Sequence, residues 1–178
     1  MRRDVVEFLR GAAGESKTMK LRISLAEQLL ELLDDDDNVL RRYPVSTAAN
    51  GAGETAGSYR TPRGRHIVRA RIGADQPLNA VFKARRPTGE IYTPELGESQ
   101  PDRDWILSRI LWLSGVEPGF NRLGECDSMR RYIYIHGTPD ETFAQAPRSH
   151  GCIRMRNADL VELFDAVPPY TPVEIVET

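Results

Sequence analysis

The amino-acid sequence predicts a mainly β fold with a helix close to its C-terminal end. Residues 131–136 alternate two kinds of side chain, as a strand with one buried face does. Residues 66–72 and 173–176 are two further strand candidates, and a Thr-Pro-Arg-Gly turn at 61–64 precedes the first of them. Residues 158–166 instead place apolar side chains at helical spacing, ahead of a Pro-Pro pair that ends the helix.

Length and composition are those of an ordinary globular protein. A chain of 178 residues is long enough for one domain with a substantial core. Its net charge of −2 gives no sign of nucleic acid or an anionic membrane surface as the main partner. No run of residues approaches the ~20 apolar positions of a membrane-spanning helix, and two cysteines do not make a disulfide framework.

Residues 1–18 are expected to form an N-terminal extension, either a short amphipathic helix or a loose segment, ahead of a domain of residues 19–178. The chain begins with basic residues, as a signal peptide does, but Asp4, Glu7 and Arg10 interrupt any apolar core. We therefore expect no secretory signal here, unless a leader was removed upstream. A true start at the methionine of position 19 is an alternative.

Two stretches in the C-terminal half carry groups that can do chemistry. Residues 148–154 read Arg-Ser-His-Gly-Cys-Ile-Arg, and residues 132–138 read Tyr-Ile-Tyr-Ile-His-Gly-Thr. They hold a thiol, Cys152, and two imidazoles, His136 and His150. A cysteine attacks a carbonyl carbon well only as a thiolate, and with an ordinary pKa of ~8.5 little of it is ionised at neutral pH. A neighbouring imidazole can take the proton, and backbone N–H groups can hold the oxyanion that forms.

This pair of stretches resembles the catalytic domain of the L,D-transpeptidase (YkuD-type) family. The family pattern is a His-Gly at a strand end, a loop of more than a dozen residues, and then Ser/Thr-His-Gly-Cys. Here His136 and Cys152 lie 16 positions apart, within that pattern. Residues 43–47 (Tyr-Pro-Val-Ser-Thr) and 61–64 extend the resemblance, which covers roughly residues 19 to 176.

The resemblance implies a twisted β-sandwich of mixed sheets with one or two short helices. It also decides the interpretation of residues 20–33. The capping-box pattern from Ser24 to Glu27 favours a helix there, whereas the family uses the segment as two opening strands, which is what we expect. Residues 34–38 then form a polar turn, and residues 39–46 pair back.

The other elements are predicted from local signals. Residues 87–101 hold three prolines and several turn formers, which favours a long loop. Residues 102–113 have apolar side chains at helical spacing, so we expect a short helix and then a strand at 111–113. Residues 115–127 are expected to be a loop, and Asn157 is expected to cap the final helix.

The resemblance implies the catalytic roles. Cys152 would be the nucleophile and His136 the general base and later acid, with the carbonyl of Gly137 fixing the ring's tautomer. The backbone N–H groups of Gly151 and Cys152 would form the oxyanion hole. His150, two residues from the thiol, competes for the role of base, and the resemblance makes it a supporting or substrate-facing residue. From residue type alone, Cys152 could also be a buried inert cysteine.

Four residues are candidates for substrate contacts. Arg154 would face the same way as Cys152 in an extended segment. It could then bind the carboxylate of a diaminopimelate centre or of a terminal D-alanine through two parallel hydrogen bonds; a structural ion pair is the alternative. Arg148 is a weaker carboxylate candidate. Ser149 is expected to bond within its loop, and Tyr134 to line the site.

A zinc site is the alternative use of these residues. The possible ligands are His136, His150, Cys152 and Cys126, but no Cys-x-x-Cys or paired-histidine spacing links them. The acidic run at 34–37 lacks the spaced ligands of a calcium loop. We therefore expect no metal and no cofactor.

The resemblance implies acyl transfer on peptidoglycan stem peptides. Cys152 would attack the carbonyl at the L centre of diaminopimelate in a tetrapeptide stem and release D-alanine, leaving a thioester. Water would complete an L,D-carboxypeptidase reaction, and the amine of another stem would complete a 3→3 crosslink. Carbapenem-type inhibitors are expected to acylate the same thiol.

The absence of a visible leader favours a cytoplasmic L,D-carboxypeptidase of murein recycling. A periplasmic L,D-transpeptidase is the alternative. A muropeptide-binding module with an unused cysteine is the alternative from another class of protein.

Overall fold

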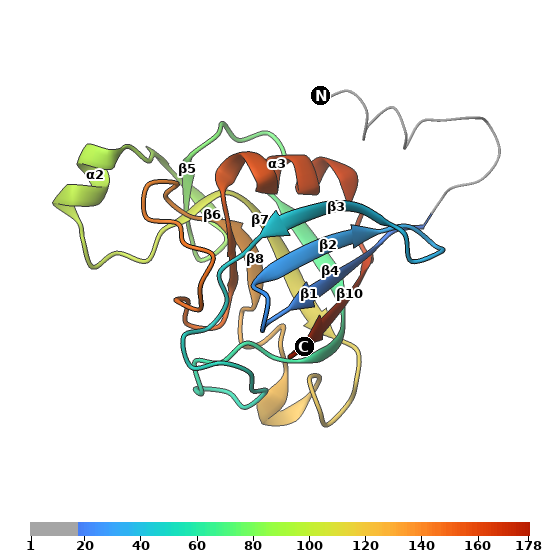
Figure 1. The fold of residues 1–178 in the computed structure, drawn as a ribbon. Coiled ribbons are helices and arrows are strands. Elements are labelled where there is room, and N and C mark those ends of the chain that lie inside the picture. The colour runs from blue at the N-terminus through green and yellow to red at the C-terminus, as the bar shows by residue number, and fades with distance from the viewer. Residues whose placement is uncertain (1–17) are drawn as a thin grey trace, which may run out of the picture.

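The computed structural model describes residues 18–178, which form a strongly twisted β-sheet and two α-helices (Figure 1). The strands are β1 (Lys20–Ser24), β2 (Leu29–Leu33), β3 (Val39–Pro44), β4 (Gly64–Ile72), β5 (Ala80–Lys83), β6 (Arg86–Ile91), β7 (Ile106–Gly115), β8 (Tyr134–Gly137), β9 (Ile153–Met155) and β10 (Pro172–Val176). The helices are α2 (Pro94–Ser99) and α3 (Asn157–Ala166), with a 3-10 turn, η1 (Gly124–Cys126). The expectations for residues 1–17 lie outside the described residues.

All ten strands of residues 18–178 belong to one mixed sheet. Its order is β3-β2-β1-β10-β4-β7-β5-β6, and β8 branches from β7 and carries β9. Most neighbours are antiparallel, but β1 runs parallel to β10 and β9 runs parallel to β8. The predicted mainly β, mixed-sheet fold is therefore confirmed. Neither α2 nor α3 is long and apolar enough to cross a membrane.

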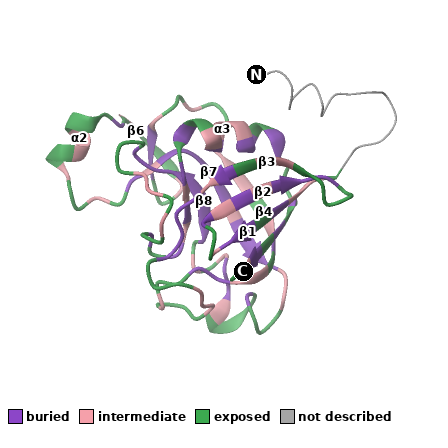
Figure 2. Ribbon diagram, viewed as in Figure 1, coloured by how far each residue is buried: buried purple, intermediate pink, exposed green. Residues whose placement is uncertain are grey.

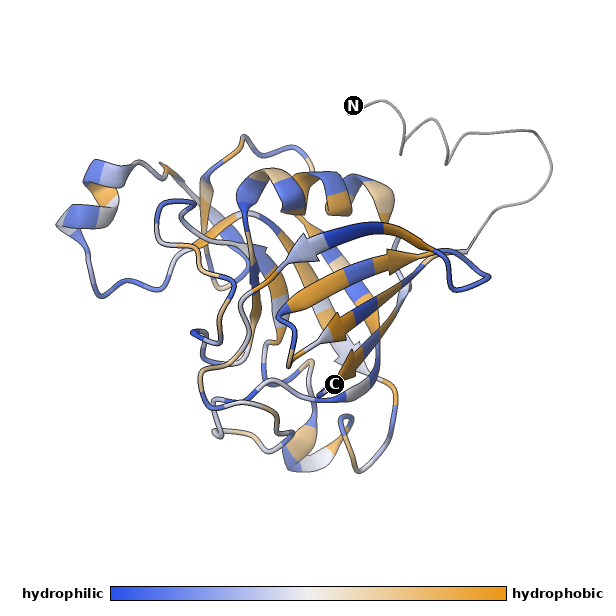
Figure 3. Cartoon of the chain, in the orientation of Figure 1, coloured by the Kyte–Doolittle hydropathy of each residue, from blue (hydrophilic) through white to orange (hydrophobic). Residues whose placement is uncertain are grey.

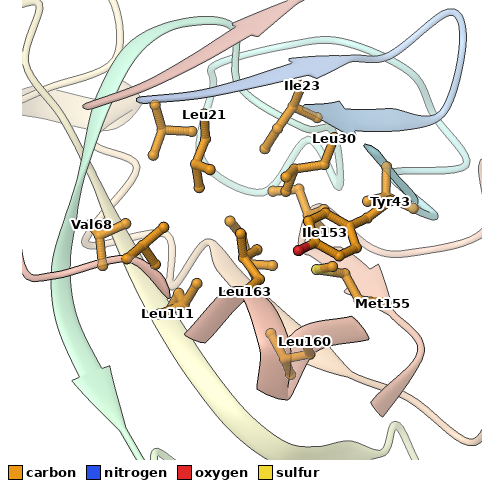
Figure 4. Packing of buried hydrophobic residues seen from close by; sticks show 14 of the residues in the cluster. Leu21, Ile23, Leu30, Tyr43, Val68, Leu111, Ile153, Met155, Leu160 and Leu163 are labelled. Carbon is orange, nitrogen blue, oxygen red and sulfur yellow. The ribbon is translucent and has the colours of Figure 1, made fainter. Parts of the chain in front are cut away.

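The sheet curls around a core that it shares with α3 (Figure 4). The inner faces of β1 and β2 supply one side of this core, and β8, β9 and α3 supply the other. Buried and apolar residues concentrate on these elements, whereas α2 has no buried residue (Figures 2 and 3). The fully buried members include Leu21, Ile23, Leu30, Ile135, Ile153, Leu160 and Leu163. Because each such side chain contributes roughly 1.5–3 kcal/mol on burial, β8 and β9 are fixed from behind by the core.

Residues 20–33 form β1, a turn and β2, as the family resemblance implied, and not the helix that their propensity favours. The capping pattern does make its bond, because Ser24 Oγ accepts the N–H of Glu27 at 3.1 Å, but within the turn. Pairing of β1 with both β2 and β10 buries alternate side chains. Burial of that period-two face outweighs local helix propensity.

The expectation of a short helix in residues 102–113 is wrong. Residues 106–115 form one continuous strand, β7, which pairs with β4, β5 and β8. Most of its residues are buried, on both faces of the sheet. The sequence of such a strand is apolar at nearly every position, so some apolar residues also fall at helical spacing.

The expectation of one long loop at residues 87–101 is also wrong. This segment completes the β5–β6 hairpin and then forms α2. Thr93 Oγ1 accepts the N–H of Leu96 at 3.2 Å, and Pro94 occupies the first helical turn. Both are ordinary helix-start signals, but the surrounding turn formers hide them.

The strand expected at residues 131–136 begins only at Tyr134. Tyr132 has φ +57°, in the left-handed region, so it lies outside the ladder. The strands expected at 39–46, 66–72 and 173–176 are confirmed as β3, β4 and β10.

Asn157 is not the N-cap of α3. That position belongs to Arg156, whose side chain makes no capping bond. The buried Asn157 side chain instead accepts a hydrogen bond from Ser108 Oγ at 2.7 Å and donates one to the carbonyl of Thr138 at 2.8 Å. A side chain at Gly137 would lie 2.3 Å from Asn157 Oδ1, so only glycine fits there. Asn157 thus joins β7, the end of β8 and α3 directly behind the site.

We predict that Asn157→Ala lowers the free energy of unfolding by about 3 kcal/mol, because two buried polar groups lose their partner. Urea unfolding followed by circular dichroism measures this. Asn50→Ala is the matched control, since that exposed side chain makes one long bond of 3.3 Å, and its change should stay within about 0.5 kcal/mol. Equal small losses for both variants would contradict the assigned role.

Candidate active site

Cys152 and His136 lie on the same face of the β8–β9 pair. The parallel register places Ile135 opposite Ile153, and both of these point into the core. Cys152 immediately precedes β9 and is level with Tyr134, whose backbone N–H lies 3.4 Å from Cys152 Sγ. Because side chains alternate along a strand, Cys152 and His136 share the face turned away from the core.

The His136 ring is held as a neutral base. Its Nδ1 lies 2.7 Å from the carbonyl oxygen of Gly137. A carbonyl can only accept, so Nδ1 carries the hydrogen and Nε2 keeps its lone pair. Burial lowers the pKa of His136 below its ordinary value, against the opposing effects of the Gly137 bond and the charge of Asp104. The imidazole is therefore uncharged at neutral pH and able to accept a proton.

The Cys152 thiol is held protonated. Burial raises its pKa to about 11, and the N–H of Tyr134 and the charge of Arg154 only partly oppose this. Sγ donates to the carbonyl of Tyr132 at 3.4 Å, and among the described residues no hydrogen bond joins it to His136. This differs from the lowered pKa typical of exposed reactive cysteines. A reaction at this thiol needs proton removal when substrate arrives.

The loop before Cys152 is fixed by segments that are distant in sequence. Thr61 Oγ1 donates to the carbonyl of Gly151 at 2.9 Å, and the N–H of Ser149 donates to the carbonyl of Thr47 at 2.9 Å. Ser149 Oγ donates to the carbonyl of Cys152 at 2.5 Å. Gly151 has φ +133°, which other residues rarely adopt. The stretches at 43–47 and 61–64 therefore position the thiol through its own loop.

The expected oxyanion donor at Gly151 is engaged in this structure. Its N–H donates to Ser149 Oγ at 3.2 Å. An oxyanion bound by this N–H would have to replace the Ser149 hydroxyl as its acceptor. Ser149 bonds within its own loop, as the sequence led us to expect.

A groove of about 610 Å³ is lined by Arg154 and His150, the neighbours of Cys152 in sequence, but not by Cys152 or His136 themselves. One wall carries Arg148, His150 and Arg154, and the facing wall comes from residues 92–105. Arg154 Nη2 donates to Asp104 Oδ1 at 2.9 Å, and its Nη1 donates to the carbonyl of Arg148 at 3.4 Å. The structural ion pair considered for Arg154 is therefore present, on a guanidinium that also borders the groove.

The remaining candidates differ in exposure. His150 is exposed, and its ring packs edge-on against Tyr59 with centroids 5.9 Å apart. Tyr134 is buried, and its hydroxyl accepts from Arg85 Nη1 at 2.9 Å. Tyr132, by contrast, is 52% exposed. Of the two tyrosines, Tyr132 is the one open to a ligand.

Sequence reasoning assigned no role to three residues that shape this site. Thr61 lay within a quoted family stretch and was interpreted only as part of a turn. Asp104 lay in the segment expected to be a helix, so nothing indicated that it pairs with Arg154. Arg85 stands close to Lys83 and Arg86, and such a basic stretch is suited to a surface strand or loop. Within residues 18–178, no group of three or more His, Cys, Asp or Glu side chains is arranged to hold a metal ion.

The fold is similar to those of solved L,D-transpeptidases at low sequence identity. The enzyme from Mycobacterium smegmatis is 18% identical with a TM-score of 0.56, over 90% of this chain and 59% of that one. The enzyme from Xylanimonas cellulosilytica is 20% identical with a TM-score of 0.51, over 91% and 62%. L,D-transpeptidase 3 from Mycobacterium tuberculosis, solved with a faropenem-derived adduct, is 15% identical with a TM-score of 0.54, over 90% and 60%. This chain thus spans about three fifths of each of these chains.

No curated protein sequence matches this one. The model of the family described as L,D-transpeptidase catalytic domain (YkuD) matches residues 19–175, which is nearly the whole chain. The chain therefore belongs to the L,D-transpeptidase catalytic domain family.

Proposed function

We propose that this protein is a cysteine acyltransferase that releases the terminal D-alanine from peptidoglycan tetrapeptide stems. One observation carries the proposal: a thiol and a tautomer-fixed neutral imidazole share one face of the β8–β9 pair. Membership of the family supplies the substrate class. Cys152 acts as nucleophile and His136 as base.

The first half-reaction forms a thioester. As Cys152 Sγ bonds to the carbonyl carbon at the L centre of diaminopimelate, its proton passes to His136 Nε2. The carbonyl oxygen becomes an oxyanion beside the N–H groups of Gly151 and Cys152. The amide bond then breaks, and the imidazolium returns the proton to the amine of the departing D-alanine. The tautomer set by Gly137 serves both proton transfers.

Arg154 is the proposed carboxylate contact in the groove. Its guanidinium already holds one carboxylate, that of Asp104, at the groove wall. A stem carboxylate could replace Asp104 with little reorganisation, since the two present the same acceptor atoms. Arg148 and His150 line the same wall and would face the stem.

Water is the proposed acceptor of the acyl group, which makes the reaction an L,D-carboxypeptidation. We propose that this reaction serves murein recycling in the cytoplasm. The amine of a second stem would use the same residues and would give a 3→3 crosslink in the periplasm. Acylation of Cys152 by carbapenem-type β-lactams is part of the proposal, in keeping with the faropenem-derived adduct of one structural relative.

The test is mass spectrometry of purified protein incubated with a diaminopimelate-containing tetrapeptide muropeptide. Loss of one D-alanine without a dimer supports the carboxypeptidase, and a crosslinked dimer means the transpeptidase. Binding of the muropeptide without any product would instead make the protein a binding module. A fusion of residues 1–30 to a reporter that works only after export checks the compartment, and robust export would overturn the cytoplasmic role.

We predict that Cys152→Ala lowers D-alanine release by at least about 10³-fold, because no other group in the site can form the thioester. Release is followed by a coupled D-alanine assay, and urea unfolding checks that the variant is folded. Cys126→Ala is the control, since that thiol lies on η1 and bonds to Leu123. If Cys126→Ala loses as much activity as Cys152→Ala, the assignment is wrong.

We also predict the pH dependence of kcat/KM. His136 must be uncharged to act as base, and its pKa is lowered, so the acid limb should lie below pH 6.5. The wild-type rate should then be flat through neutrality. His136→Gln should lower it by about 10²–10⁴-fold at pH 7. The residual rate of that variant should rise about tenfold per pH unit toward the thiol pKa of about 11. A wild-type rate that climbs in the same way would show that His136 is not the base.

A further inference from the structure

Arg85 occupies a position that the proposed chemistry does not use. It lies in the turn between β5 and β6, and its guanidinium carbon is 4.8 Å from the ring centroid of Trp112 and 4.8 Å from that of Tyr132. Its Nη1 donates to the hydroxyl of Tyr134 at 2.9 Å. Two aromatic rings and a phenol therefore hold the cation in one place.

The backbone of this turn is unfavourable for the residues it contains. Ala84 has φ +46° and Arg85 has φ +65°. Two successive left-handed residues are typical of a hairpin turn that prefers Asn-Gly. Neither residue here is glycine or asparagine, so the favourable turn residues are absent at the point where the arginine is presented.

The charge of Arg85 has no counter-ion within residues 18–178. Two arginines that line the groove are paired: Arg154 with Asp104, and Arg103 with Glu90. Arg85 is half-buried, and its hydrogen bond to Tyr134 leaves the other N–H groups without a protein acceptor among the described residues. A guanidinium that is fixed in place but still has free donors is suited to bind a carboxylate with two hydrogen bonds.

Arg85 and Arg154 are placed by different parts of β8, and Arg85 contacts the residues on the N-terminal side. Tyr134, which holds Arg85, is level with the thiol, and Tyr132 precedes it. In the β8–β9 register, the backbone of Arg154 is opposite that of His136, which lies two residues after Tyr134 on β8. Tyr134 contacts both Arg85 and the thiol, so a stem that reaches Cys152 can extend toward Arg154 in one direction and toward Arg85 in the other.

We infer that Arg85 is a specificity-determining residue that binds a carboxylate of the donor stem on the side of the scissile bond away from Arg154. This inference rests on the proposed function. The stem offers two such groups, the α-carboxylate of D-glutamate and the side-chain carboxylate of diaminopimelate. Both present the same chemistry to the guanidinium.

The experiment compares three synthetic tetrapeptide stems: one with both carboxylates free, one amidated at D-glutamate and one amidated at diaminopimelate. We expect wild-type protein to show a kcat/KM about tenfold lower for one of the amidated stems, and this stem identifies the carboxylate. In Arg85→Gln the discrimination between that stem and the free stem should fall to parity. Arg85→Lys, which keeps the charge but not the planar fork, should give an intermediate ratio.

Arg86→Gln is the matched control, because Arg86 is the exposed neighbour on the same hairpin and should keep the wild-type ratio. The inference is overturned if wild-type protein treats all three stems alike, or if Arg85→Gln lowers all three rates equally. If no stem releases D-alanine, the proposed function has failed separately. The same comparison is then made by calorimetric binding to the Cys152→Ala protein, and equal affinities for the free and amidated stems would overturn the inference.

Discussion

The parallel pairing of β8 with β9 is the constraint on which the site depends. These strands are short and come from segments far from the opening strands in sequence, yet their core-facing isoleucines are fully buried. Because a shift of one residue would turn every side chain to the other face, burial of Ile135 and Ile153 fixes the faces of His136 and Cys152 as well. The hydrophobic core thereby sets the geometry of the polar pair.

Burial also sets the protonation states of that pair. Removal from water disfavours both charged forms. The thiol is therefore a weaker acid, and the imidazole a weaker base, than in solution. Arg154 and Arg131 favour the thiolate, but desolvation is the larger effect. The resting site is a neutral acid and a neutral base on one face of the β8–β9 pair, and in the proposed mechanism charge separates only when a carbonyl is present to receive the sulfur. Such a site protects the thiol from unspecific reaction, at the cost of needing a base during the attack.

Much of this arrangement could be predicted from the sequence. The spaced His-Gly and Ser-His-Gly-Cys stretches identified the pair of residues, and the alternation before position 136 predicted the strand that carries His136, although β8 begins only at Tyr134. The secondary-structure prediction was wrong for β7 and for residues 87–101. A strand buried on both faces shows no alternation of apolar and polar residues. The start of α2 uses Thr and Pro, which are also turn formers, so it does not stand out from the surrounding residues. Asp104 and Arg85 lie in or beside those misread segments, so the partners of Arg154 and Tyr134 could not be foreseen. Thr61 reaches Gly151 across 90 positions, a contact that no local pattern encodes.

Trapping the acyl enzyme tests the proposed Cys152 thioester most directly. Protein mixed with a tetrapeptide stem is quenched in acid within the first turnover, digested, and examined by mass spectrometry. The proposed mechanism predicts an added mass equal to the stem without its D-alanine on the peptide that contains Cys152, removable by hydroxylamine as a thioester is. Release of D-alanine with no adduct on that peptide at any quench time, or an adduct on Cys126 instead, would contradict it.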